Sequence, residues 1–195
     1  FLFAGGDRRA DQPGQSQSEN KPSSKVIEMS DELFDYTVSI EGTVYQFHCQ
    51  YQVFVDDGWT ISSSDVRDTT KILAEDYVFF QMANNGKVIW LYSYNMSGNS
   101  KQLKDCFVGG IQFDAYNKAE VKLAKDICLT STIEEVLEAF GTPNDRYDGE
   151  NSISLTYSQD NSVHNSVKFT FYKDTEMGYN DISVKNFLAT EADKT

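Results

Sequence analysis

The chain has 195 residues, of which 39% are apolar and 13% aromatic, so it can bury a substantial core and is not expected to be disordered throughout. Its formal net charge of −13 repels phosphate groups, which argues against nucleic acids as partners. An anionic bilayer surface would repel the chain in the same way, so we expect contact with a membrane only through an N-terminal anchor.

The first 30 residues differ from the rest of the chain in composition. They open with the apolar segment FLFAGG and continue with a stretch rich in Gln, Ser, Asn and Pro. Six residues are too few to span a bilayer, which needs about 20. We interpret residues 1–30 as an apolar remnant and a flexible polar tether, which predicts an extracytoplasmic domain tethered to the cell membrane. The alternative is an ordinary disordered N-terminus.

The first predicted α+β unit covers residues 31–117 and begins with two short strands. Apolar and polar residues alternate on both sides of Glu41-Gly42, as in two half-buried strands around a turn. A short helix should follow, because apolar residues recur at helical spacing before a glycine that can end the helix in the left-handed conformation. These residues are Tyr51, Phe54 and Val55, and the glycine is Gly58.

Residues 77–94 carry the clearest hairpin pattern of the chain. Two aromatic and β-branched runs flank Asn84-Asn85-Gly86, and Asn and Gly tolerate the positive φ that tight hairpin turns require. A further strand is predicted near residues 106–113. Its Gly109-Gly110 pair indicates a β-bulge or the close approach of another backbone segment.

The second predicted unit covers residues 118–195 and consists of a helix over 132–140 and a three-stranded meander. Ser131 and Thr132 both fit the capping-box pattern, with Glu134 and Glu135 as their respective partners. The helix should end at a glycine that a proline follows. The three strands are expected in 152–157, 166–172 and 181–187, where the sequence alternates between apolar and polar residues.

The two units share a faint internal similarity at an offset of 83 residues. At this offset both contain a strand edge, a short amphipathic helix and a glycine at the helix end. The aligned pairs are Val44 and Ile127, Val53 and Val136, Phe54 and Leu137, and Gly58 and Gly141. We therefore expect an α+β fold in which short helices pack on antiparallel sheet, built from two tandem helix-plus-meander units.

The C-terminal part, residues 127–187, resembles a known pattern of cap, core and helix-end residues. The matching positions are Ser131, Thr132, Glu135, Val136, Gly141, Pro143 and Tyr157. Small bacterial lipoproteins of the SmpA/OmlA type carry this pattern, as do domains like the β-lactamase inhibitor protein. The segments EGTVYQF and YQVFVDDGWTI are similar to envelope lipoproteins of low-G+C Gram-positive bacteria. The resemblance implies an exported, non-enzymatic domain that binds proteins or the cell wall.

The same resemblance extends to the first residues of the chain. The segment Phe3-Ala4-Gly5-Gly6 resembles a bacterial lipobox, but Gly6 stands where the lipidated cysteine would be. This departure leaves lipidation of the native precursor open.

Side chains with catalytic or metal-binding chemistry form no pattern that we can assign to a reaction. His48 and His164 have no second ligand at a metal-binding spacing, and the common nucleophile and phosphate-binding motifs are missing. The three cysteines lack C-x-x-C spacing, so one disulfide with one thiol and three separate thiols are both open. They are Cys49, Cys106 and Cys128.

In residues 144–155, Asp148-Gly149 could stand at positions five and six of a calcium-binding loop. Arg146 and Leu155 would then occupy positions that require carboxylates, which favours an acidic turn instead. We therefore expect no metal, no cofactor and no catalytic residue.

Aromatic residues around the predicted hairpin are the remaining candidates for a site. An exposed face that carries Trp59, Trp90, Tyr92 and Tyr94 would suit binding to a protein or a glycan. The alternative is that both faces of the hairpin are buried, one by its own helix and the other by the second unit. From the sequence alone we favour burial.

Three functions follow from these patterns. The first is an exported, membrane-tethered, non-catalytic module for binding or envelope maintenance, which contacts a protein or a cell-wall component. The second is an inhibitor whose concave sheet grips an enzyme. The third is a glycan hydrolase assembled from scattered carboxylates, which would require a cleft with two facing acids.

Overall fold

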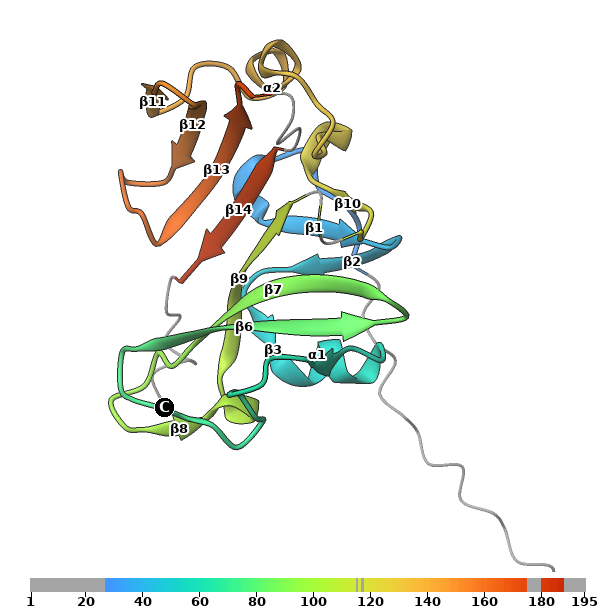
Figure 1. Ribbon diagram of the computed structural model, residues 1–195. Helices are drawn as coiled ribbons and strands as arrows, with labels where there is room; N and C mark the ends of the chain where they lie inside the picture. The colour runs from blue at the N-terminus through green and yellow to red at the C-terminus, as the bar shows by residue number, and fades with distance from the viewer. Residues whose placement is uncertain (1–26, 115, 117, 175–179, 188–195) are drawn as a thin grey trace, which may run out of the picture.

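The computed structural model describes residues 27–114, 116, 118–174 and 180–187. Most of the predicted tether, residues 1–26, lies outside this description. The described residues form a mixed α+β fold in which every strand pairing is antiparallel, which confirms the predicted class (Figure 1). None of the described helices is both long and apolar enough to cross a membrane.

The main sheet is a continuous ladder, and its N-terminal half follows helix α1 (Tyr51–Asp56). The strands of this half are β4 (Thr60–Ile61), β6 (Tyr77–Asn84), β7 (Lys87–Tyr94) and β9 (Phe107–Asp114). The C-terminal half follows helix α2 (Ile133–Phe140). Its strands are β11 (Asp145–Asp148), β12 (Ser152–Ser158), β13 (Asn165–Tyr172) and β14 (Asp181–Asn186).

The spatial order of the strands is β11-β12-β13-β14-β9-β7-β6-β4, and the short strand β3 (Cys49–Gln50) also pairs with β9. In each half a helix is therefore followed by four strands in meander order. The last strands of the two halves, β9 and β14, pair with each other. The sheet thus contains strands from both predicted units.

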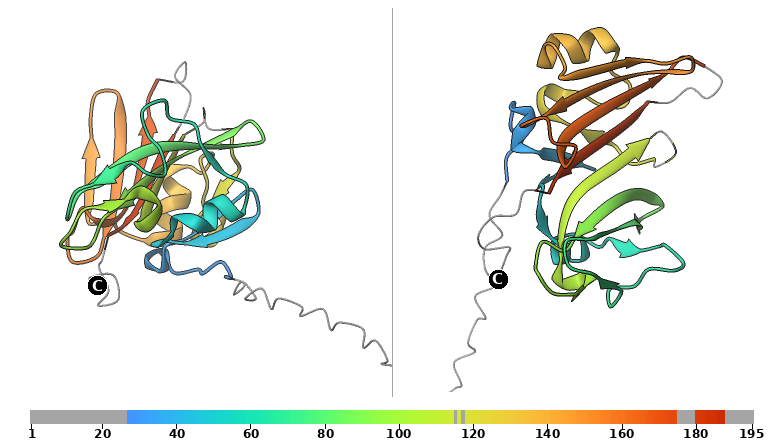
Figure 2. Two further views of the ribbon diagram at one scale, coloured as in Figure 1. Left: turned by 90° about the horizontal axis from the view of Figure 1, so that it is seen from below. Right: turned by 90° about the vertical axis from the view of Figure 1, so that its left-hand side faces the viewer.

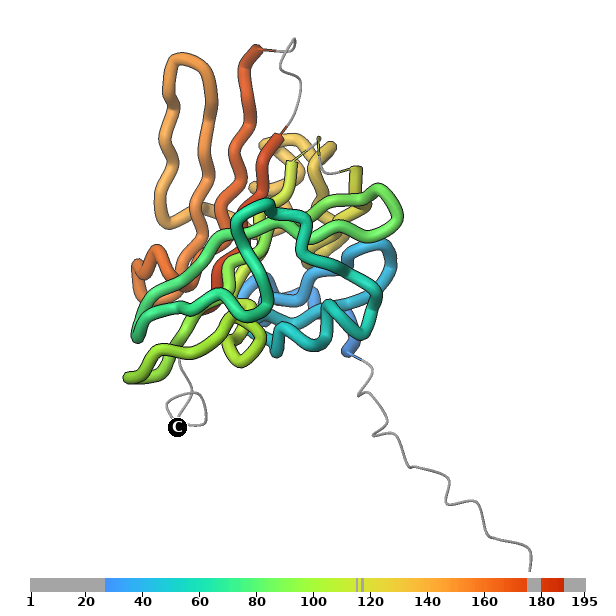
Figure 3. Tube along the Cα trace, turned by 60° about the horizontal axis from the view of Figure 1, so that its bottom comes forward, coloured from blue at the N-terminus to red at the C-terminus, as the bar shows by residue number. Residues whose placement is uncertain are grey.

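The main sheet is strongly twisted. Hairpin β12–β13 and strand β14 run side by side, while hairpin β6–β7 crosses their direction at a steep angle (Figure 3). Strand β9 lies between the two groups and pairs with both β14 and β7. Twist of this kind is the ordinary consequence of right-handed strand geometry accumulated over many strands.

Both helices pack on the same face of the main sheet. One row of residues paired across six strands is almost fully buried there, and it contains Phe80, Leu91, Ile111, Val184, Val167 and Tyr157. Tyr51 of α1 lies against Phe80, and Phe140 of α2 lies against Tyr157. In the right-hand view of Figure 2, α2 lies to one side of the C-terminal strands.

A smaller sheet completes the layer that covers this face. Its order is β10-β1-β2, with β1 (Thr37–Ile40), β2 (Thr43–Gln46) and β10 (Val121–Lys122). Tyr45 of β2 stacks on Phe54 of α1 with ring centroids 4.6 Å apart. The turn that the sequence predicted between β1 and β2 is present, and it has positive φ at Glu41 and Gly42.

Short elements connect these layers. Strands β5 (Lys71–Ile72) and β8 (Lys101–Gln102) form a separate pair. Single-turn 3₁₀-helices in the described ranges are η1 (Leu33–Asp35), η2 (Leu103–Asp105) and η4 (Ala124–Asp126).

Helix α2 begins at the capping box that the sequence predicted, with Thr132 as the N-cap. The Glu135 backbone N–H donates to Thr132 Oγ1 at 3.2 Å, and the Thr132 N–H donates to Glu135 Oε2 at 2.8 Å. The other candidate, Ser131, instead accepts a hydrogen bond from the Cys128 N–H. Two of the N–H groups at the helix start therefore have side-chain partners.

Thr132→Ala should lower the free energy of unfolding by about 1 kcal/mol, because the Glu135 N–H loses its acceptor. Urea unfolding followed by circular dichroism measures this loss. Thr132→Ser keeps the hydroxyl and should stay close to the wild type. Equal losses for the two variants would show that the cap contributes nothing.

The two helices differ at the positions that the 83-residue offset aligns. Val53 of α1 is 39% exposed, whereas Val136 of α2 is fully buried. The helices also differ in length, with six residues in α1 and eight in α2. The aligned residues therefore have different packing environments.

Strand β11 adds a fourth strand to the predicted three-stranded meander. It pairs with β12 in the segment that the sequence predicted as an acidic turn. All four of its residues are exposed, so it has no buried side for an alternating pattern to reveal.

Gly109 and Gly110 have both of the properties that their sequence predicted. The register between β7 and β9 shifts at this point, because Tyr92 faces Gly110 while Ser93 faces Val108. Gly109 is the extra residue of this β-bulge. A Cβ at Gly110 would overlap the carbonyl oxygen of Val184 on β14.

Candidate functional site

The face of the main sheet opposite α1 and α2, here called the open face, carries a group of aromatic side chains. Side chains alternate along a strand, so neighbours of the buried row point to this face. The group, called the aromatic cluster, comes from β6, β7 and the residue after β14. It consists of Tyr77, Phe79, Trp90, Tyr92, Tyr94 and Phe187.

The rings of the aromatic cluster pack on one another. Phe79 stacks on Trp90 with centroids 4.9 Å apart and lies 4.5 Å from Tyr92. Tyr94 stacks on Phe187 at 5.0 Å with an interplanar angle of 2°. These contacts fix the rings in one arrangement, which lowers the entropy lost when a partner binds.

The cluster is accessible to solvent although its central rings are covered by their neighbours. Tyr77 is 49% exposed and Phe79 is 38% exposed, whereas Tyr92 retains only 9%. The sequence-based preference for burial of both hairpin faces is therefore wrong. The second half does not cover the hairpin. Instead it extends the same sheet edge to edge through the pairing of β14 with β9.

Three of the four residues that the sequence proposed for this surface lie on the open face, and one does not. Trp90, Tyr92 and Tyr94 belong to the aromatic cluster. Trp59 is only 3% exposed and belongs to the core between α1 and β4. Its backbone N–H donates to the Phe54 carbonyl at the end of α1, which holds it at the inner side.

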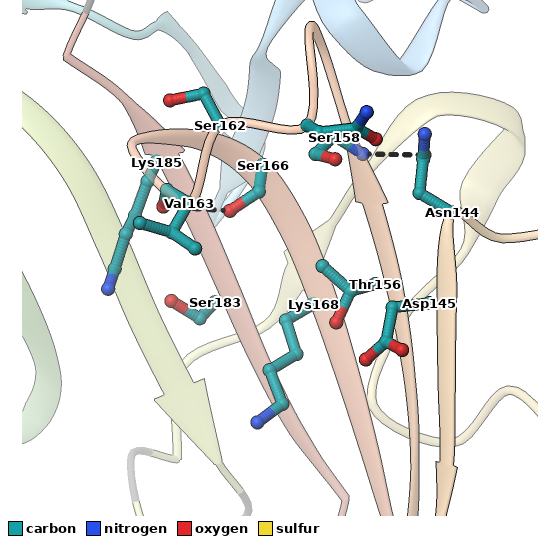
Figure 4. Close-up of a pocket in the computed structure, with 11 residues that line it drawn as sticks. Asn144, Asp145, Thr156, Ser158, Ser162, Val163, Ser166, Lys168, Ser183 and Lys185 are labelled. Atoms are coloured by element: carbon teal, nitrogen blue, oxygen red, sulfur yellow. Dashed lines mark hydrogen bonds between the residues drawn. The ribbon is translucent and has the colours of Figure 1, made fainter.

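A polar groove lies beside the aromatic cluster on the C-terminal half of the open face. It consists of two adjoining hollows of about 440 and 450 Å³, which share Lys168, Ser183 and Lys185. Figure 4 shows these three side chains in the first hollow, with Ser183 between the two lysines. The other Ser and Thr residues of the lining are Ser152, Ser154, Thr156, Ser158, Ser162, Ser166 and Thr170.

Gly110 is where the polar groove and the aromatic cluster meet. It is paired with Tyr92 on one side and with Lys185 on the other. Because Gly110 has no side chain, Lys185 can extend across β9, and its Nζ lies 4.8 Å from the centroid of the Tyr92 ring. This cation–π contact links the two halves of the open face.

A chain of hydrogen bonds orders the floor of the groove next to this junction. The Tyr92 hydroxyl donates to Gln112 Oε1 at 2.9 Å, and Gln112 Nε2 donates to Asp181 Oδ2 at 2.9 Å. Burial raises the pKa of Asp181, and the nearby Asp114 raises it further, while Gln112 and Lys168 oppose the change. Asp181 is thus a partly desolvated acid that is held in place by an amide.

Asp181→Asn should stabilise the protein at neutral pH. An acid whose pKa is raised on folding takes up protons, so stability falls as pH rises above its ordinary pKa of 3.8. Asparagine keeps an oxygen for Gln112 and removes the cost of the charge. Urea unfolding across pH should show the advantage of the variant at pH 7 and its disappearance below about pH 3.8. An advantage that persists unchanged in acid would contradict this explanation.

The histidines and cysteines lie apart from the groove lining. His48 packs edge-on against Phe107, and His164 stacks on Phe187 at 5.9 Å. All three cysteines are free thiols, which settles the alternative that the sequence left open. Burial raises the pKa of Cys49 to about 12 and that of Cys106 to about 11. Within the described ranges, no three His, Cys, Asp or Glu side chains converge as a metal site would require.

Sequence reasoning missed most of the residues that form the open face. Tyr77 and Phe79 alternate along β6 as Trp90 and Tyr92 do along β7, and the hairpin register places them on the same face. The two-residue alternation in the sequence is therefore a signal for these two residues. Lys168 and Lys185 lie on the polar side of two predicted strands, but their proximity depends on the pairing of β13 with β14.

In comparisons with known proteins, no protein family model, no curated protein and no solved structure matches the chain significantly.

Proposed function

We propose that the chain is a non-catalytic module that binds another protein through its open face. The observation that carries this proposal is the continuity of the aromatic cluster with the polar groove across β7, β9 and β14. Aromatic anchors beside adaptable hydroxyl and amino groups are the combination on which protein interfaces depend. The other face has no comparable role, because it is occupied by the core.

The arrangement of the rings favours a protein over a glycan as the partner. A sugar ring binds best to a free aromatic face. Here Phe79 and Trp90 stack on each other, Tyr94 stacks on Phe187, and Lys185 lies over Tyr92. The cluster therefore offers ring edges and hydroxyl groups over a broad surface, as tyrosine-rich binding surfaces for proteins do.

An enzyme inhibitor is a special case of the same proposal, in which the bound protein is an enzyme. The open face would then cover or distort the active site of that enzyme. Loss of the enzyme's activity on addition of the chain would distinguish this case from envelope maintenance.

A carboxylate-based glycan hydrolase is the alternative, and one observation favours it. Asp114 and Asp181 are direct register partners across β9 and β14, and the pKa of Asp181 is raised by burial. However, Asp181 accepts a hydrogen bond from Gln112, and Asp114 accepts one from the Tyr116 N–H at 2.8 Å. Asp145, the other groove carboxylate, lies three strands from Asp181, about 14 Å at ordinary strand spacing. Glycosidases separate their acids by about 5–9.5 Å.

We further propose that the two helix-plus-meander halves are tandem units of a β-lactamase-inhibitor-protein-like kind. The support is their common element order and the pairing of their last strands. On this proposal the halves have diverged on the open face. The N-terminal half presents most rings of the aromatic cluster, and the C-terminal half presents most hydroxyl and amino groups of the polar groove.

The proposed location is the outer side of the cell membrane, to which the N-terminal segment would tether the module. The support is compositional: an apolar start is followed by a polar stretch before the acidic body. Fractionation of cells that express the complete precursor tests it. Recovery in the membrane fraction, with accessibility to added protease, is expected, and recovery in the cytosol would contradict the tether.

Site-specific photo-cross-linking tests the binding proposal. A photoreactive amino acid replaces Tyr77 or Tyr172 on the open face, or Val53 or Leu73 elsewhere on the surface. The four positions are similarly accessible, at 49%, 38%, 39% and 58% exposure respectively. In an envelope extract of the source cells, the open-face positions should cross-link to one discrete protein and the other two should not. Equal products from all four, or products from Val53 and Leu73 alone, would contradict the proposal.

A further inference from the structure

Lys168 and Lys185 form a pair of like charges within the polar groove. Lys168 faces Ser183 across β13 and β14, and Lys185 faces Ser166 on the same two strands. The lysines are thus diagonal neighbours on one side of the sheet, a relation in which long side chains reach each other. Both line the two hollows of the groove.

Among the described residues, neither lysine has a carboxylate at ion-pair distance, although Asp145 and Asp181 line the same groove. The salt bridges formed among described residues, Lys87 with Glu41, Lys122 with Glu120 and Arg146 with Asp148, include neither lysine. Burial lowers the pKa of Lys185, and the positive charge of Lys168 lowers it further. An incoming carboxylate would relieve this repulsion, because opposite charge stabilises both ammonium groups.

The surroundings of the pair determine what else the ligand should carry. Tyr92 lies under the Lys185 ammonium group, and the rest of the aromatic cluster continues from it. Ser183 and Ser166 add hydroxyl groups between and beside the lysines. A carboxylate bound to the lysines would therefore have an apolar or aromatic neighbour within reach of the cluster.

The net charge of the chain does not prevent such binding. Most of the 30 acidic residues lie elsewhere, and at physiological salt their field decays over about 8 Å. The groove lining also contains Asp145 and Asp181, and the charge of Lys168 acts on Asp181. Lys185, which lies over the Tyr92 ring, has no carboxylate among the charges that shift its pKa, so a carboxylate in contact with it would meet a positive group.

We propose that the lysine pair receives an aspartate or glutamate side chain of the partner protein, and that an apolar or aromatic residue beside it packs on the aromatic cluster. This inference rests on the proposed function and names the chemistry of the segment that the open face binds. It makes the open face selective for acidic-aromatic segments in proteins.

Selection from a displayed library of random linear peptides tests the inference. The full chain is the bait, and the double variant Lys168→Gln/Lys185→Gln is used for counter-selection. Enriched peptides should contain Asp or Glu next to an aromatic or aliphatic residue. Individual peptides should bind the double variant about 10-fold more weakly, the equivalent of about 1.4 kcal/mol. The matched variant Lys71→Gln/Lys104→Gln, which changes two exposed lysines off the open face, should bind like the wild type.

The outcomes separate this inference from the proposed function. If no enriched peptide depends on the two lysines, the inference is wrong. If such peptides still require Phe79 and Trp90, the open face remains a protein-binding surface. Peptides that bind equally well without the lysines and without both rings would overturn both proposals. A panel of acidic oligosaccharides serves as the second probe, and lysine-dependent binding to it without any lysine-dependent peptide would overturn the peptide assignment.

Discussion

Gly110→Ala is expected to lower the free energy of unfolding by about 3 kcal/mol, as overpacking against an immobile neighbour does. The added methyl group would overlap the Val184 carbonyl oxygen and lie 3.3 Å from the Lys185 Cα. Both are backbone atoms of β14, so relief requires β14 to move away from β9. That movement would open the junction between the two halves of the sheet.

Urea unfolding followed by the fluorescence of the two tryptophans, Trp59 and Trp90, measures the effect. Gly98→Ala is the matched control, because its Cβ would meet no atom within 4 Å and its φ is not positive. That change should alter stability by less than about 0.5 kcal/mol. If the two variants lose equal stability, the close approach at Gly110 is not a structural constraint.

The double variant Phe79→Ala/Trp90→Ala is expected to weaken partner binding by about 30-fold or more, the equivalent of about 2 kcal/mol. The two rings stack on each other, Phe79 is 38% exposed, and Phe79 also lies against Tyr92. Their removal takes away apolar contact area and loosens the side chain beneath Lys185. Titration with the cross-linked partner, or with a selected peptide, measures the loss.

Two comparisons keep this result specific. Leu73→Ala removes an exposed apolar side chain off the open face and should leave affinity unchanged. Unfolding curves of the double variant should retain the wild-type cooperativity, because Phe79 is 38% exposed and contributes little to the core. Unchanged affinity in the folded double variant would show that the cluster is not the binding surface.

Local patterns predicted most elements of the fold. The alternation on either side of Asn85-Gly86 placed β6 and β7, and both turn residues have the positive φ that was expected. The capping box at Thr132 placed the start of α2. These features depend on neighbours within a few residues, so one sequence is sufficient to reveal them.

Pairing between strands that are far apart in the sequence could not be predicted from local patterns. Nothing local indicates that β14 pairs with β9, and this pairing decides whether the second half covers the hairpin or extends it. Trp59 was misplaced for a related reason. An aromatic residue after a helix-ending glycine suits a core or a surface equally well, and only the packing between α1 and β4 buries it.

The candidate site was predictable only in part. Trp90, Tyr92 and Tyr94 share one side of a strand, so their common direction follows from the two-residue period. The lysine pair and the role of Gly110 need the register of three strands, which a single sequence does not encode locally.

Hydroxyl-radical footprinting of the full chain, in buffer and in envelope extract, tests most directly whether the open face is where a partner binds. The method reads the solvent accessibility of individual aromatic side chains. We predict protection of Tyr77 and Phe79 in the extract, with Tyr116, which is 71% exposed outside the aromatic cluster, unchanged. Protection of Tyr116 while Tyr77 and Phe79 stay fully reactive would contradict the account.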